Sequence, residues 1–168
     1  MMPIKPFFAY RSFRKELHTV KRFYDAGIRQ FCVFPSNTTN SLGQPYVDYP
    51  PNWLYFDACE FGHADRQIDD ILSVAPEAEL LCMIDLNSPN WLIRQLMGTL
   101  ADSTMGLSDA LTTERWRKET LNYMRALITH LETAYPGRIK GYILACGMTD
   151  EWMDYSKGRE LAGKLDAY

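Results

Sequence analysis

The sequence has no strong charge of either sign, which argues against partners that are bound mainly by electrostatic attraction. Its 168 residues carry a formal net charge of −3, and the basic side chains are scattered along the chain. A nucleic-acid or anionic-membrane interface would need a basic patch or stripe. We therefore expect neither a nucleic acid nor a membrane as a partner.

Long apolar runs and closely spaced cysteines are also absent. The apolar stretch at residues 7–10 is too short for a signal peptide, and no later run approaches the ~20 residues of a membrane span. The cysteines lack the paired spacing of a zinc site or a redox motif. We expect reduced thiols in a cytoplasmic protein that uses no metal and no cofactor. These cysteines are Cys32, Cys59, Cys82 and Cys146.

Four short apolar runs predict the buried strands of a parallel sheet. They are nearly continuously apolar, as expected where both faces of a sheet are covered. Stripes of apolar residues with helical spacing lie between them, and this alternation predicts an α/β fold with right-handed crossovers. The four runs are residues 7–10, 28–34, 80–85 and 139–146.

The connections between these elements differ in length according to their direction. The turns from helix to strand are tight and contain Gly or Pro, whereas residues 35–62 and 86–112 form long connections from strand to helix. This asymmetry is typical of a TIM barrel. A doubly wound sheet usually has a glycine-rich turn after its first strand, and residues 11–14 contain no glycine. We therefore predict one domain, residues 1–168, formed by the first four strand–helix units of a (β/α)8 TIM barrel.

Four strands cannot close a barrel, so the outer strands of this half barrel would have unpaired backbone edges. The last helical stripe reaches Tyr168 without a stop signal, which indicates a truncated helix. We expect that the remaining half of the barrel, or a second copy of the chain, covers these edges. An open four-stranded α/β layer is the third alternative.

Candidate functional residues follow the second and third predicted strands. Asp85, Asn87 and Trp91 combine carboxylate, amide and indole groups that fit sugar recognition, because a ring packs on a pyranose face and amides bond to hydroxyls. A proline-nucleated turn with a partly buried tryptophan is the structural alternative. Asn37 and Trp53 in the preceding long loop have a similar character, although aromatic side chains also pack long loops together.

After the fourth predicted strand, Glu151 stands next to Trp152. A carboxyl group beside an indole has the environment that raises its pKa and suits it to general-acid catalysis. A solvated loop glutamate beside a stacking tryptophan explains the same spacing equally well.

Residues 141–152 resemble the fourth strand of clan A glycoside hydrolases, particularly the β-galactosidase-like enzymes, in which the acid/base glutamate ends that strand. The turn Pro89-x-Trp91-Leu92 is similar to one that lines their sugar site, and residues 154–156 are similar to the start of their next helix. The resemblance implies a retaining glycoside hydrolase that acts on β-linked carbohydrate. It implies Glu151 as general acid/base, with Trp91 and Trp152 in the sugar subsite.

The sequence departs from this family at two points. Asp150 stands where the family commonly has an asparagine that contacts the sugar, which makes Asp150 a competing candidate. The family's nucleophile ends a seventh strand, which would lie beyond residue 168. A retaining mechanism needs two carboxylates roughly 5 Å apart, so Glu151 alone could protonate a leaving group without forming a covalent intermediate.

Two other functions fit the same residues. The first is a non-catalytic half barrel that binds carbohydrate or assembles with another chain. The second is a metal-dependent barrel enzyme that uses Asp85, Glu151 and His63, although no spacing selects these residues as ligands.

Overall fold

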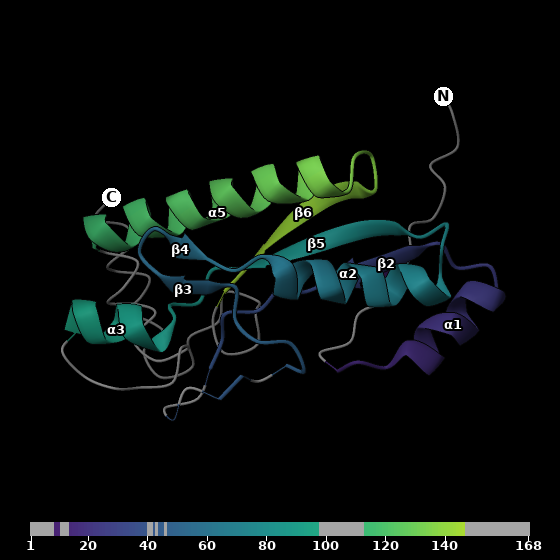
Figure 1. Ribbon diagram of the computed structural model, residues 1–168, viewed down its shortest axis with the longest axis horizontal. Helices are drawn as coiled ribbons and strands as arrows, with labels where there is room; N and C mark the ends of the chain where they lie inside the picture. The colour runs from purple at the N-terminus through teal and green to yellow at the C-terminus, as the bar shows by residue number, and fades with distance from the viewer. Residues whose placement is uncertain are drawn as a thin grey trace, which may run out of the picture.

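The computed structural model describes residues 9–10, 14–39, 42, 44–45, 47–97 and 113–146, and these residues form a parallel sheet, helices and a small hairpin (Figure 1). All neighbouring strands of the sheet run parallel. Their order is β1 (Ala9–Tyr10), β2 (Gln30–Val33), β5 (Glu79–Asp85) and β6 (Ile139–Ala145). The hairpin strands β3 (Trp53–Tyr55) and β4 (Ala58–Cys59) pair antiparallel outside this sheet.

The described helices are α1 (Leu17–Asp25), α2 (Gly62–Val74), α3 (Asn90–Met97) and α5 (Glu114–Ala134). The hydroxyl oxygen of Thr113 caps α5 by accepting a hydrogen bond from the backbone N–H of Trp116 at 3.2 Å. The turn after α5 contains Gly137 with a φ of 72°, a left-handed conformation that glycine adopts without a steric penalty. No helix in the described ranges is long and apolar enough to cross a membrane.

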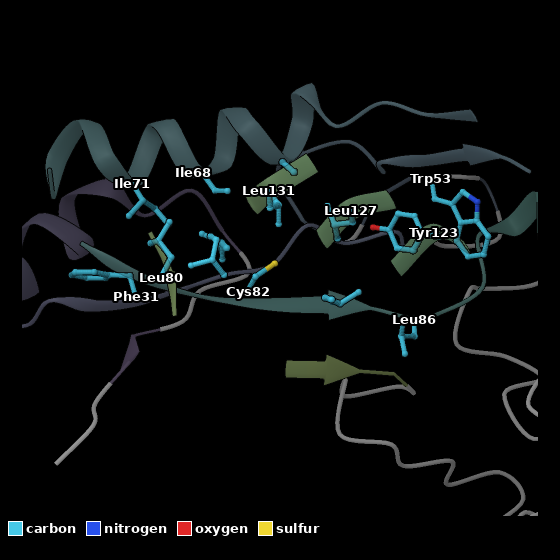
Figure 2. Close-up of a cluster of buried hydrophobic side chains, with 14 of the residues drawn as sticks. Phe31, Trp53, Ile68, Ile71, Leu80, Cys82, Leu86, Tyr123, Leu127 and Leu131 are labelled. Atoms are coloured by element: carbon cyan, nitrogen blue, oxygen red, sulfur yellow. The ribbon is translucent and has the colours of Figure 1, made fainter. Parts of the chain in front are cut away.

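The main core lies between one face of the sheet and the helices, as Figure 2 shows. Successive side chains of a strand point to opposite faces. Phe31 of β2 and Leu80 of β5 therefore contact the same core as Ile68 of α2 and Leu127 of α5, and all four side chains are fully buried. The other face carries a smaller cluster, formed by Cys32, Phe34, Val47, Met83 and Ala145.

The prediction of a half TIM barrel made of four strand–helix units is wrong. The chain between β2 and α2 contains the β3–β4 hairpin, and the described residues between β5 and β6 form two helices, α3 and α5. The sheet consists mainly of β2, β5 and β6, because β1 adds only 2 residues at its edge. Alternating strands and helices, even with unequal loops, occur in open sheets and in barrels alike, so the sequence pattern could not separate them. The helix predicted after residue 156 lies outside the described residues.

The last strand, β6, lies at one edge of the sheet and presents two large apolar side chains to solvent. Ile143 is 42% exposed and Leu144 is 46% exposed. Exposed apolar side chains on an edge strand are compatible with a protein neighbour. That a second copy or further chain covers this edge stays a prediction.

Candidate functional site

The carboxyl ends of β2, β5 and β6 lie at one edge of the sheet, because the three strands are parallel neighbours. The predicted site residues that the structure describes are found at this edge or in the adjoining hairpin and helix α3. They are Asn37, Trp53, Asp85, Asn87 and Trp91. The other three predicted site residues, Asp150, Glu151 and Trp152, lie outside the described residues.

Asp85, the last residue of β5, is fully buried and accepts hydrogen bonds from the chain that follows β2. Its Oδ2 accepts from the Ser36 hydroxyl at 2.7 Å and from the Asn37 backbone N–H at 2.7 Å. The backbone N–H and hydroxyl of Thr38 donate to the same oxygen at 2.9 and 2.8 Å. Its Oδ1 accepts from the Asn87 backbone N–H at 2.9 Å. Asp85 thus fixes the loop after β2 against its own strand.

Burial raises the pKa of Asp85 above the usual range of an aspartate, and the hydrogen bonds from Ser36, Asn87, Thr38 and Asn37 oppose this rise. A ligand could reach the carboxylate only by displacing these donors. In this geometry Asp85 positions the loop and does not itself contact a ligand.

Asn37 extends the hydrogen bonding from Asp85 to the hairpin and to α2. Its side-chain amide donates to the backbone carbonyl of Asp85 at 3.3 Å. Its Oδ1 accepts from the backbone N–H groups of Asn52 and Trp53 at 3.1 and 3.0 Å. Asn52 in turn accepts from the backbone N–H of Ala64, in the first turn of α2, at 3.0 Å. Asn37 therefore links the start of the hairpin to Asp85.

Asn87 connects the ends of the three main strands. Its amide donates to the Thr38 hydroxyl at 2.9 Å, and its Oδ1 accepts from the Cys146 thiol at 3.5 Å. Cys146 directly follows β6, while Thr38 follows β2. All three side chains are buried, so Asn87 contributes to the arrangement of this edge from within the protein.

Trp53 and Trp91 belong to an aromatic cluster beside this network. Figure 2 shows the Trp53 ring beside Tyr123 of α5, on which it stacks with centroids 4.9 Å apart. The Trp53 ring also meets the Trp91 ring edge-on at a centroid distance of 5.4 Å. Trp91 also contacts Tyr55 and Phe56 at centroid distances of 5.0 and 4.9 Å. Its indole N–H donates to the backbone carbonyl of Trp53 at 3.2 Å. Trp53 is only 2% exposed, whereas Trp91 is partly exposed.

A shallow pocket of about 180 Å³ lies where the hairpin meets the start of α3. Its walls are mainly apolar, and Trp91, Leu54 and Pro89 contribute to them. Asn90 and Thr39 add polar atoms, with the Thr39 hydroxyl donating to the Asn90 Oδ1 at 2.8 Å. An aromatic side chain with an amide beside it can bind one face of a sugar and one of its hydroxyls.

Sequence reasoning missed five polar residues that build or line this region: Ser36, Thr38, Thr39, Asn52 and Asn90. One signal could have indicated the first three. A run of hydroxyl and amide residues directly after a buried strand, Ser36 to Thr39, can supply donors to an aspartate that ends the neighbouring strand. Nothing in the sequence indicates the pairing of Asn52 with the start of α2.

The metal-binding alternative used Asp85, His63 and Glu151. In the part of the chain that the structure describes, no three His, Cys, Asp or Glu side chains could together hold a metal ion. Asp85 already accepts donors on both oxygens. Glu151 lies outside that part of the chain.

Comparisons with known proteins identify no relative of this chain. The chain matches no protein-family model, no curated protein sequence and no solved structure. Its function is therefore inferred from the residues and their geometry.

The role of Asp85 predicts the effect of Asp85→Asn. An asparagine of the same size puts an NH₂ group where an oxygen accepts N–H groups, so we expect the free energy of unfolding to fall by about 2–4 kcal/mol. Urea unfolding measures this change. The control Asp25→Asn removes an exposed carboxylate paired with Lys21 and should change stability by less than about 0.5 kcal/mol. A loss below about 1 kcal/mol for Asp85→Asn would show that these hydrogen bonds do not hold the loop.

Proposed function

We propose that the chain binds β-linked carbohydrate in the Trp91 pocket, as the sugar-binding part of a retaining glycoside hydrolase-like protein with Glu151 as its general acid/base. The observation that carries this proposal is a partly exposed indole, held in one orientation, on the wall of a pocket with amide and hydroxyl groups.

The orientation of Trp91 is set before any ligand arrives. Three aromatic neighbours contact its ring, and its N–H is bonded to the hairpin backbone. A side chain that loses little freedom on binding retains more of the interaction free energy as affinity. A sugar stacking on this ring would thus meet a rigid surface.

The polar side of the pocket suits a ligand with several hydroxyl groups. Asn90 and Thr39 both line the pocket and are bonded to each other, and an amide or hydroxyl can both donate to and accept from a sugar hydroxyl. Asn37 also lines the pocket, but its side chain bonds to Asp85, Asn52 and Trp53. We therefore assign Asn37 a positioning role.

The proposed role of Glu151 rests on the family resemblance and on the course of β6. The end of this strand is paired with the end of β5, with Ala145 opposite Asp85. The chain that leads towards Glu151 thus starts from the edge of the sheet that carries the Trp91 pocket. A retaining mechanism also needs a second carboxylate as the nucleophile, and Glu151 as general acid/base does not fill that role.

Replacing the ring tests the binding proposal. We expect Trp91→Leu to weaken binding of a β-linked oligosaccharide by about tenfold, because an aromatic contact contributes on the order of 1 kcal/mol beyond its buried area. Titration calorimetry against a panel of β-linked oligosaccharides measures the affinity. The matched control Tyr142→Leu changes a half-buried ring on β6 that is absent from the pocket lining and should leave binding unchanged. Equal affinity of Trp91→Leu and the unchanged chain would contradict the proposal.

Replacing the acid tests the catalytic part separately. We expect that any hydrolysis of an unactivated β-linked oligosaccharide by the chain falls at least ~100-fold in Glu151→Gln while oligosaccharide binding is retained, because an amide cannot donate the proton that a sugar leaving group needs. Oligosaccharide binding without hydrolysis by the unchanged chain would favour the non-catalytic alternative. Hydrolysis at the same rate in Glu151→Gln would exclude Glu151 as the acid.

A further inference from the structure

A second hollow, of about 340 Å³, lies between α5 and the β3–β4 hairpin, which run close together in Figure 1. The hairpin side supplies the rings of Phe56 and Trp53, and Phe61 adds a third ring from the start of α2. Ala126 of α5 is exposed on the opposite wall, where its small side chain leaves room beside the rings. Of the predicted functional residues that the structure describes, only Trp53 lines this hollow.

Among the described residues that line the hollow, the charged side chains are both acidic. They are Asp57 of the hairpin turn and Glu119 of α5, and no described lysine or arginine lines the hollow. Within the described residues, neither carboxylate takes part in an ion pair or a side-chain hydrogen bond. Arg115 lies outside the lining, with its guanidinium carbon 4.5 Å from the centre of the Phe56 ring. The aromatic surface beside the hollow therefore already attracts one cation.

The ring of Tyr123 also lines the hollow, where it stacks on Trp53 and is 2% exposed.

We propose that this hollow binds a small organic cation of the alkylammonium or quaternary ammonium class. Aromatic faces attract such cations, and the carboxylates of Asp57 and Glu119 add direct charge attraction. The same carboxylates repel anions, which excludes phosphate and carboxylate ligands. A volume of about 340 Å³ lies within the range of small-molecule sites.

The site is distinct from the Trp91 pocket. The sugar pocket is formed with the start of α3, whereas the cation site is formed with α5, and Trp53 is the residue that lines both. A failure to bind carbohydrate would therefore leave the cation site untouched.

Titration calorimetry with choline, compared with its uncharged isostere 3,3-dimethylbutan-1-ol, tests the proposal. The two probes have nearly the same shape, so the difference in affinity reports the charge. We expect choline to bind at least about tenfold more tightly than the isostere. Equal affinities would identify an apolar hollow and overturn the proposal, and so would the absence of choline binding at millimolar concentrations.

Variants locate the charge that attracts the cation. We expect the double variant Asp57→Asn/Glu119→Gln to weaken choline binding by about tenfold or more. The control Asp25→Asn/Glu77→Gln removes two exposed carboxylates from α1 and from the turn after α2, and should change the affinity by less than about twofold. An equal loss in the control would show a general effect of net charge and overturn the site assignment. Circular dichroism and the Tm confirm that both double variants are folded before the comparison.

Discussion

Five hydrogen bonds converge on the carboxylate of Asp85, at the end of the interior strand β5. Four of them come from residues 36–38, which enter the protein interior directly after β2. Backbone N–H groups buried there need acceptors, and Asp85 accepts from those of Asn37 and Thr38. The start of the long connection after β2 can therefore be buried while the backbone N–H groups of Asn37 and Thr38 remain hydrogen-bonded.

The position of the hairpin depends on this contact through Asn37, which bonds to Asp85 with its amide and to the hairpin backbone with its carbonyl oxygen. The hairpin in turn places Trp53 between α3 and α5, where its ring contacts Trp91 on one side and Tyr123 on the other. Both proposed binding sites are built on these contacts. A buried carboxylate that lines neither site thus contributes to the geometry of both.

Local patterns in the sequence predict the strands and the long helix but not their assembly. The apolar run ending at Asp85 becomes β5, and the stripe with helical spacing before the fourth apolar run becomes α5. The hairpin was missed because its turn, Phe56-Asp57, lacks the glycine of a tight hairpin signal. Barrel closure depends on long-range geometry that no local period encodes, which explains the wrong half-barrel prediction. The residues of the loop after β2 that bond to Asp85 are 47 to 49 positions away from it in the sequence. Local spacing patterns do not predict contacts at such separations.

Amide hydrogen exchange tests the central role of Asp85 most directly. If its carboxylate holds the loop, the amide hydrogens of Asn37 and Thr38 exchange as slowly as those of the core strand β5, because both are released only by the same opening of the structure. In Asp85→Asn, we then expect the amide hydrogens of Asn37 and Thr38 to exchange much faster than those of β5. Rapid exchange of Asn37 and Thr38 in the unchanged protein, at the rate of exposed loops, would contradict this role.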